Sequence, residues 1–169
     1  MRHFTQSAAL AAVIALGLAG SALAQDAVPP GEQPVDPYVQ SNANAGAKPM
    51  DDTRVFEAFR GKDGLVRIAA DTVDRSMADP RIKEIFATTD VPRLKRTLAE
   101  QFCYVLGGGC AYSGRDMAAV HKDMGVTNRD MNALIENLQL AMDKEGVPFF
   151  AQNKLLAKLA PMQRSVVER

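Results

Sequence analysis

The histidines and cysteines are the residues of this sequence best suited to chemistry. The 169 residues include two histidines, His3 and His121, and two cysteines, Cys103 and Cys110. His3 lies in an N-terminal stretch that is typical of a cleaved export signal. Any chemistry of the remaining chain that needs an imidazole must therefore use His121.

The N-terminal residues predict export. An apolar run over residues 8–18 follows a basic start, and residues 22–24 are Ala-Leu-Ala, the small residues that a signal peptidase recognises. The run is shorter than the ~20 residues that a membrane-spanning helix needs, and no comparable run follows it. We therefore interpret residues 1–24 as a signal peptide cleaved before Gln25, and we expect a periplasmic or secreted protein without a stable membrane anchor.

Composition divides the rest of the chain into two parts. Residues 25–50 are rich in Pro, Gly, Ala, Gln and Asn and hold few apolar residues that could offset the entropy of ordering. They predict a disordered leader or linker, with a docking motif as the alternative. Residues 51–169 have the length of a single domain. The 20 Lys and Arg balance the 20 Asp and Glu without forming a basic block, which argues against a nucleic-acid partner.

The two cysteines are candidates for a disulfide. Cys103 and Cys110 are seven residues apart, and an exported protein meets an oxidising environment. Closing so short a loop would stabilise the fold by roughly 2–3 kcal/mol in the chain-entropy model. The bridge would anchor the loop that leads to His121. Because spacing does not fix geometry, two separately buried free thiols are the alternative.

The apolar residues of the domain repeat at helical intervals, and no run alternates with period two. Glycines or prolines end the repeats at Gly61, at Pro80, at residues 107–109 and at residues 146–148. The spacing predicts an all-α domain with helices over about 55–59, 65–77, 91–105, 131–142 and 155–166. Thr127, three residues before Asp130, predicts a capping box at the start of the fourth helix, and Pro161 should kink or shorten the last one.

His121 lies in an irregular stretch between two long predicted helices. Most lone histidines are ordinary polar residues, and metal sites usually gather several His, Cys, Asp or Glu side chains. Spacing alone indicates no such cluster here. A haem differs, because its porphyrin supplies four ligands to the iron and the protein can supply a single axial imidazole. One histidine is therefore enough for a haem site.

The domain from about Val55 onward resembles the truncated haemoglobins, most closely group I. The segments that carry the resemblance, in order, are 78–82, 85–95, 106–117, the stretch around His121, 125–127 and 145–148. The resemblance implies a shortened globin fold, a two-over-two helical sandwich, with haem b as cofactor. It implies that His121 is the proximal iron ligand and that a diatomic gas (oxygen, nitric oxide or carbon monoxide) is bound.

The resemblance also assigns positions around the haem. Phe86 matches the phenylalanine that wedges against the porphyrin, and the other matched positions line its two faces. The implied contact residues are Phe86, Val73, Leu94, Leu98, Phe102, Met117 and Val126. Ordinary core packing would predict burial of the same apolar residues, so burial alone does not separate the two interpretations.

The sequence departs from the family on the distal side. Group I members commonly carry a tyrosine at the position of Val73 and a glutamine near that of Leu98, whose side chains donate hydrogen bonds to the gas. Such a bond is worth roughly 1.5–3 kcal/mol, about a factor of ten to a hundred in affinity. We therefore expect weak or easily oxidised oxygen binding. The nearest polar candidates are Thr72, Thr97, Gln101 and Tyr104, and water, Lys95 or Tyr104 could supply a sixth ligand.

Several functions remain open at this point. The first is an exported gas-binding haem protein. The alternatives are a redox or gas sensor that acts through the leader, a nitric oxide dioxygenase that needs an external reductase or electron donor, and a haem-free relative that keeps only the fold. Whether the protein is an enzyme is left open by the sequence.

Overall fold

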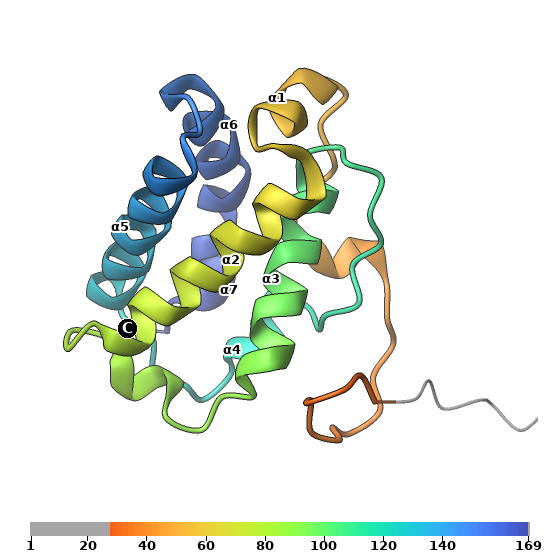
Figure 1. The fold of residues 1–169 in the computed structure, drawn as a ribbon. Helices are drawn as coiled ribbons and strands as arrows, with labels where there is room; N and C mark the ends of the chain where they lie inside the picture. The colour runs from red at the N-terminus through yellow and green to blue at the C-terminus, as the bar shows by residue number, and fades with distance from the viewer. Residues whose placement is uncertain (1–27, 169) are drawn as a thin grey trace, which may run out of the picture.

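The structure is a computed structural model that describes residues 28–168, and all the regular elements within this range are helical (Figure 1). The predicted signal peptide lies outside these residues. The α-helices are α1 Thr53–Ala58, α2 Gly61–Ala78, α3 Val91–Val105, α4 Met117–His121, α5 Asn128–Glu145, α6 Phe149–Leu159 and α7 Gln163–Val166, and the 3-10 helices are η1 Asn42–Ala45, η2 Lys83–Phe86 and η3 Ala160–Met162. Between residues 28 and 168 no helix is both long and apolar enough to span a membrane.

Local sequence signals set the ends of the long helices. The Asp90 carboxylate accepts a hydrogen bond from the Arg93 backbone N–H at the start of α3, where proline occupies the first turn. Thr127 and Asp130 form the predicted capping box of α5, and Gly146 ends that helix at a φ of 75°. Near Pro161 the last helix changes into η3 and then α7, as proline predicts.

Two helix pairs build the domain (Figure 1). Helix α2 packs against both α3 and α5, and α3 also contacts α6. This arrangement is the two-over-two helical sandwich. The largest fully buried side chains of the core include Phe59, Leu65, Ile68, Phe102, Leu106, Met142 and Leu155. Each such side chain contributes roughly 1.5–3 kcal/mol of burial free energy, so this core holds the helices in place.

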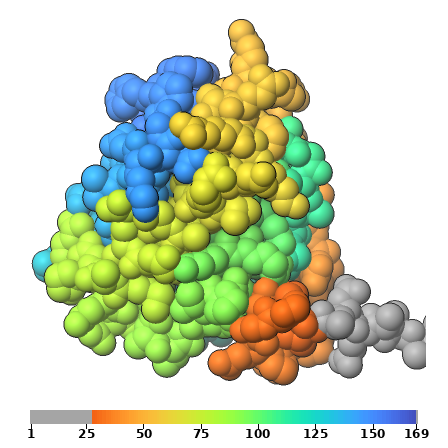
Figure 2. Space-filling model, in the orientation of Figure 1, coloured from red at the N-terminus to blue at the C-terminus, as the bar shows by residue number. Residues whose placement is uncertain are grey.

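Residues 28–50, which we call the strap, lie against the domain instead of hanging free as a disordered leader. The strap runs beside α3 and the loop over residues 106–116 (Figure 1), and its residues form part of the surface next to α3 (Figure 2). Ala45 is fully buried, the Tyr38 hydroxyl donates to the Ser113 carbonyl at 2.6 Å, and the Met50 N–H donates to the Val105 carbonyl at 3.0 Å.

The composition-based prediction fails for the strap because polar contacts with distant residues hold it in addition to the burial of Ala45. Glu32 has a side chain that is only 3% exposed and is paired with Arg93 at 3.3 Å and with Arg96. A composition rule counts apolar residues and is blind to partners that are more than 60 positions away. For residues 25–27, which lie outside the described range, the leader stays a prediction.

Close packing against the strap and α1 explains two glycines of the 106–116 loop. Gly107 has a φ of +78°, and a Cβ on it would lie 2.2 Å from the Met50 carbonyl oxygen. A Cβ on Gly108 would lie 2.3 Å from the Phe56 ring. The first glycine supplies a backbone conformation that other residues rarely adopt, and the second supplies room.

Candidate functional site

His121 is the last residue of the short helix α4, and local contacts fix that helix at both ends. The Asp116 carboxylate accepts a hydrogen bond from the Ala119 N–H at 2.9 Å, which caps the first turn. After His121 the chain turns through Asp123, whose φ of 63° is left-handed, before α5 begins. The five-residue helix thus presents one imidazole between two turns.

The imidazole of His121 has one ring nitrogen engaged and one available. Its Nδ1 lies 2.8 Å from the Met117 carbonyl oxygen. A carbonyl oxygen can only accept, so Nδ1 carries the proton and donates. In the neutral ring the proton-free lone pair is then on Nε2, which has no hydrogen-bond partner among residues 28–168. This is the tautomer and the hydrogen bond that a metal-ligating histidine uses.

The structure distributes the predicted haem-contact residues over several elements. Leu98 and Phe102 of α3 and Met117 of α4 share one apolar cluster, in which Phe102 is 1% exposed. Val73 of α2 and Val126 before α5 are buried outside that cluster. The remaining positions, namely Phe86, Leu94 and His121, lie outside it and are half-buried.

The half-buried apolar side chains are the feature that fits a porphyrin. Phe86, Leu94, Leu98 and Met117 keep part of their surface open, whereas Phe102 and Val105 of α3 are fully buried. Covering such surface stabilises by about 25 cal/mol per Å², so a flat apolar group would gain by lying there. No group of three or more His, Cys, Asp or Glu side chains that could hold a bare metal ion occurs in the described part of the chain. The donor set therefore fits a haem, which needs one protein ligand, better than a bare ion.

The two threonines considered as distal hydrogen-bond donors are already engaged. Thr72 is 1% exposed, and its hydroxyl donates to the Ile68 carbonyl at 2.7 Å. Thr97 donates to the Arg93 carbonyl at 2.9 Å. Both bonds stay within their own helices, so neither threonine replaces the tyrosine and glutamine of the family.

The longer side chains considered as distal donors or as a sixth ligand make other contacts in the structure. Lys95 forms an ion pair with Asp74 at 2.6 Å, which joins α3 to α2. Gln101 donates its amide N–H to the Ala45 carbonyl of the strap at 2.9 Å. Tyr104 is half-buried and packs against the apolar core. Sequence reasoning missed the role of Gln101, because its partner lies 56 positions away in a segment predicted to be disordered.

The two cysteines are bonded in the structure. Cys103 at the end of α3 and Cys110 in the following loop have Cα atoms 5.7 Å apart. Cys103 is 1% exposed, and the Gly108 N–H donates to its carbonyl at 2.8 Å. The bridge thus ties the start of the loop toward α4 to the end of α3.

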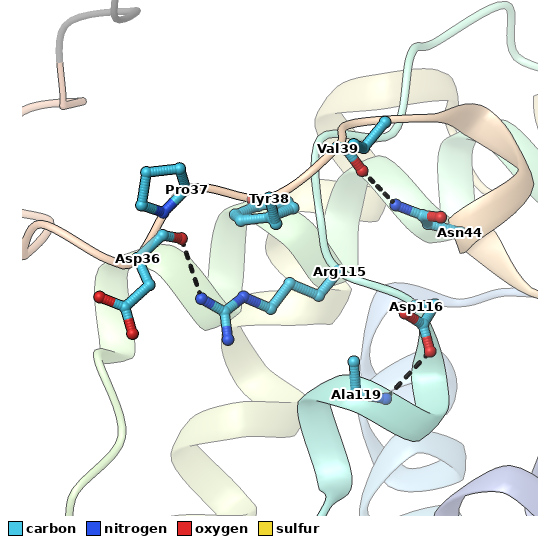
Figure 3. A pocket seen from close by; sticks show the side chains of 8 residues that line it. All are labelled: Asp36, Pro37, Tyr38, Val39, Asn44, Arg115, Asp116 and Ala119. Carbon is cyan, nitrogen blue, oxygen red and sulfur yellow. Dashed lines mark hydrogen bonds between the residues drawn. The ribbon is translucent and has the colours of Figure 1, made fainter.

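Two cavities of the described residues lie away from the predicted contact residues. One, of about 420 Å³, lies where the strap meets the start of α4 and is lined in part by Tyr38, Arg115 and Asp116 (Figure 3). The other, of about 610 Å³, lies between residues 49–55 and α6. Neither is lined by His121, and the imidazole geometry argues more directly for a site than the size of these two cavities.

Comparison with known proteins agrees with the fold and with the resemblance to the truncated haemoglobins. Residues 54–168 match the family described as bacterial-like globin. A group 1 truncated hemoglobin of Mycolicibacterium paratuberculosis is 28% identical over 108 residues, which cover 64% of this chain and 79% of that protein. A group 1 truncated hemoglobin of Tetrahymena thermophila is 30% identical over 93 residues, which cover 55% of this chain and 77% of that protein.

Solved structures show the same arrangement of helices. The truncated hemoglobin of Tetrahymena pyriformis in its Fe(III) form superposes with a TM-score of 0.65 at 23% identity, covering 68% of this chain and 98% of that one. At this identity the likeness shows the fold alone, and the family match over residues 54–168 carries the assignment. The chain therefore belongs to the bacterial-like globin family, as a truncated two-over-two globin, and this membership implies a haem cofactor and a diatomic gas ligand.

Proposed function

We propose that this protein is an exported haem b globin that binds a diatomic gas reversibly, with His121 as the axial ligand of the iron. The observation that carries the proposal is the hydrogen bond between His121 Nδ1 and the Met117 carbonyl, which leaves the Nε2 lone pair free to bind a metal. The bond also fixes the ring against rotation. Export rests on the signal sequence over residues 1–24.

The chain's own residues would hold the porphyrin by apolar contact. Phe86, Leu94, Leu98 and Met117 offer half-exposed apolar surface, and Val73, Phe102 and Val126 back it with buried side chains. When bound, haem would supply the iron that binds a diatomic gas.

The proposed distal side lacks a strong hydrogen-bond donor. Val73, Leu94 and Leu98 are apolar, and the nearby threonines and Gln101 are bonded to backbone carbonyls. We therefore infer that oxygen leaves this protein faster than it leaves relatives with a tyrosine and a glutamine there. Nitric oxide and carbon monoxide depend less on such donors and are the better probes of the site.

The test is an absorption spectrum of protein purified from a haem-supplied preparation, in ferric, ferrous and carbon monoxide-bound forms. His121→Gly should lose the axial imidazole and shift or lose the Soret band, and added free imidazole should restore the wild-type spectrum. Lys122→Ala, an exposed neighbour, is the control and should match the wild type. Equal spectra for wild type and His121→Gly, or no stoichiometric haem in either, would contradict the proposal.

A gas or redox sensor is the second candidate, because the strap contacts the loop that leads to α4. Asn42 Oδ1 accepts a hydrogen bond from the Tyr112 N–H at 2.8 Å, and Tyr38 bonds to Ser113. Binding of a gas at the iron would then change how tightly the strap is held against the domain. Protease sensitivity of residues 28–50, compared between the ferrous and carbon monoxide-bound forms, distinguishes the candidates, since a simple gas carrier should show no difference.

A further inference from the structure

Gln101 is a buried polar residue that joins three parts of the chain. It lies on α3, is 6% exposed, and donates its Nε2–H to the Ala45 carbonyl of the strap at 2.9 Å. The same amide nitrogen lies 3.4 Å from Met117 Sδ and 3.5 Å from Met162 Sδ, both of which accept weakly. The side chain therefore bridges the strap, the first residue of α4 and η3.

Met117 extends this bridge to the imidazole. Its sulfur accepts from Gln101, while its backbone carbonyl accepts from His121 Nδ1 at 2.8 Å. One residue is thus held by Gln101 through its side chain and holds His121 through its main chain. A shift of Met117 would move the acceptor that orients the ring, because hydrogen-bond strength falls steeply with distance and angle.

The strap also forms hydrogen bonds with the residues just before α4. Three side chains of the strap form hydrogen bonds to this backbone: Asn42 Oδ1 accepts from the Tyr112 N–H at 2.8 Å, the Tyr38 hydroxyl donates to the Ser113 carbonyl at 2.6 Å, and Asn44 Nδ2 donates to the Gly114 carbonyl at 3.2 Å. In addition, the Asp36 carbonyl of the strap accepts from Arg115 Nη2 at 3.0 Å. Arg115 also lies over the Tyr38 ring, 5.1 Å from its centroid (Figure 3). These contacts fix the chain on the N-terminal side of Met117.

We propose that Gln101 and the strap are positioning elements for His121, acting through Met117. This inference rests on the proposed role of His121 as axial ligand. Gln101 acts here as a tether between α3, the strap and α4, and not as a distal donor to the gas. Partners that orient a metal-binding histidine typically change metal affinity 10–100-fold when they are removed. We expect an effect in the lower part of that range, because the bond from Nδ1 to Met117 itself would remain.

A second buried glutamine provides a matched control. Gln152 on α6 is 4% exposed and donates its Nε2–H to the Val147 carbonyl at 2.9 Å. It also bonds to Asp143, and neither partner belongs to α4 or the strap. Replacing either glutamine by methionine removes one amide of the same size and burial. Only Gln101→Met removes a contact that leads to His121.

The first readout uses the haem-free protein. Amide hydrogen exchange across residues 117–121 should become about tenfold faster in Gln101→Met, because the loss of one buried hydrogen bond frees the start of α4 to open. Gln152→Met should leave exchange in this segment unchanged. Asn42→Ala, a change at an exposed strap residue, should act in the same direction as Gln101→Met and decides the question where Gln101→Met fails to fold.

The second readout is the iron–imidazole stretching band of the ferrous haem protein by resonance Raman spectroscopy. This band should shift or broaden in Gln101→Met and Asn42→Ala and keep its wild-type position in Gln152→Met. If His121→Gly shows the same iron–imidazole band as the wild type, the proposed function is overturned. The hydrogen-exchange data would then still test whether Gln101 holds the start of α4. A His121-dependent band that is the same in all three variants, with equal exchange across residues 117–121, would overturn this inference alone.

Discussion

The ion pairs of Glu32 make the docking of the strap directly testable. Glu32 accepts hydrogen bonds from Arg96 Nε and from Arg96 Nη2, the latter at 2.9 Å, and it lies 3.3 Å from Arg93. Its side chain is 3% exposed. Glu32→Gln keeps the size of the side chain and removes the charge, so two arginines lose their ion pair with the strap, although Arg93 keeps a hydrogen bond to the Gln33 carbonyl at 2.6 Å.

The loss of stability expected for Glu32→Gln depends on which partners the two arginines keep. Breaking a fully buried ion pair costs roughly 3–5 kcal/mol, because one charge is left without a partner. Arg96 is 30% exposed and keeps Glu100 at 2.7 Å, and Arg93 keeps Asp90, so neither arginine is stranded. The glutamine oxygen can also accept one bond. We therefore expect a loss of about 1–2 kcal/mol, or roughly a 5- to 30-fold rise in the open population of the strap.

Hydrogen exchange and limited proteolysis of residues 28–50 measure this opening. Amides of the strap should exchange about 5- to 30-fold faster in Glu32→Gln, while those of α2 and α5 should change little, because the strap opens locally. Glu84→Gln is the control, since Glu84 is 83% exposed and lies 3.8 Å from Lys83. Unchanged strap exchange in Glu32→Gln would refute the view that these ion pairs hold the strap.

Three further predictions concern the site, the disulfide and pH. Leu98→Gln introduces the missing amide donor, and stopped-flow measurements should show oxygen dissociation slowed about tenfold; an unchanged rate would mean that the side chain does not face the gas. Cys103→Ser with Cys110→Ser should lower the free energy of unfolding in urea by roughly 2–3 kcal/mol, and labelling of both thiols in non-reduced wild-type protein would contradict the bridge. Hydrogen bonds from arginines hold the pKa of Glu32 and of Glu145 below the usual range. Their contribution to the stability of the fold is therefore complete above the unfolded pKa of about 4.3, and it is lost as pH falls through the lower folded pKa values. Thermal melts should show stability falling below about pH 4.3 and no loss from these two groups between pH 5 and 7.

The helices and their ends were predictable from the sequence because the signals are local. The capping box of Thr127 and Asp130 acts within one turn, and Pro161 breaks its helix through its own ring. Apolar spacing of three and four residues then determines which face of each helix is buried. His121 was singled out by count alone, since no other histidine follows the predicted signal sequence.

Only the tertiary structure decided the contacts between distant segments. Glu32 finds Arg96 across 64 positions, and Gln101 finds Ala45 across 56, and no periodic pattern encodes either pair. For the same reason composition predicted a disordered strap, and sequence left the cysteine pairing open. The sequence supplied the imidazole of His121, and the fold determined its tautomer, because the Met117 carbonyl accepts the hydrogen bond from Nδ1 only once α4 has formed. Local chemistry thus specifies which residues are present and which helices they form, whereas long-range polar pairing depends on how those helices pack.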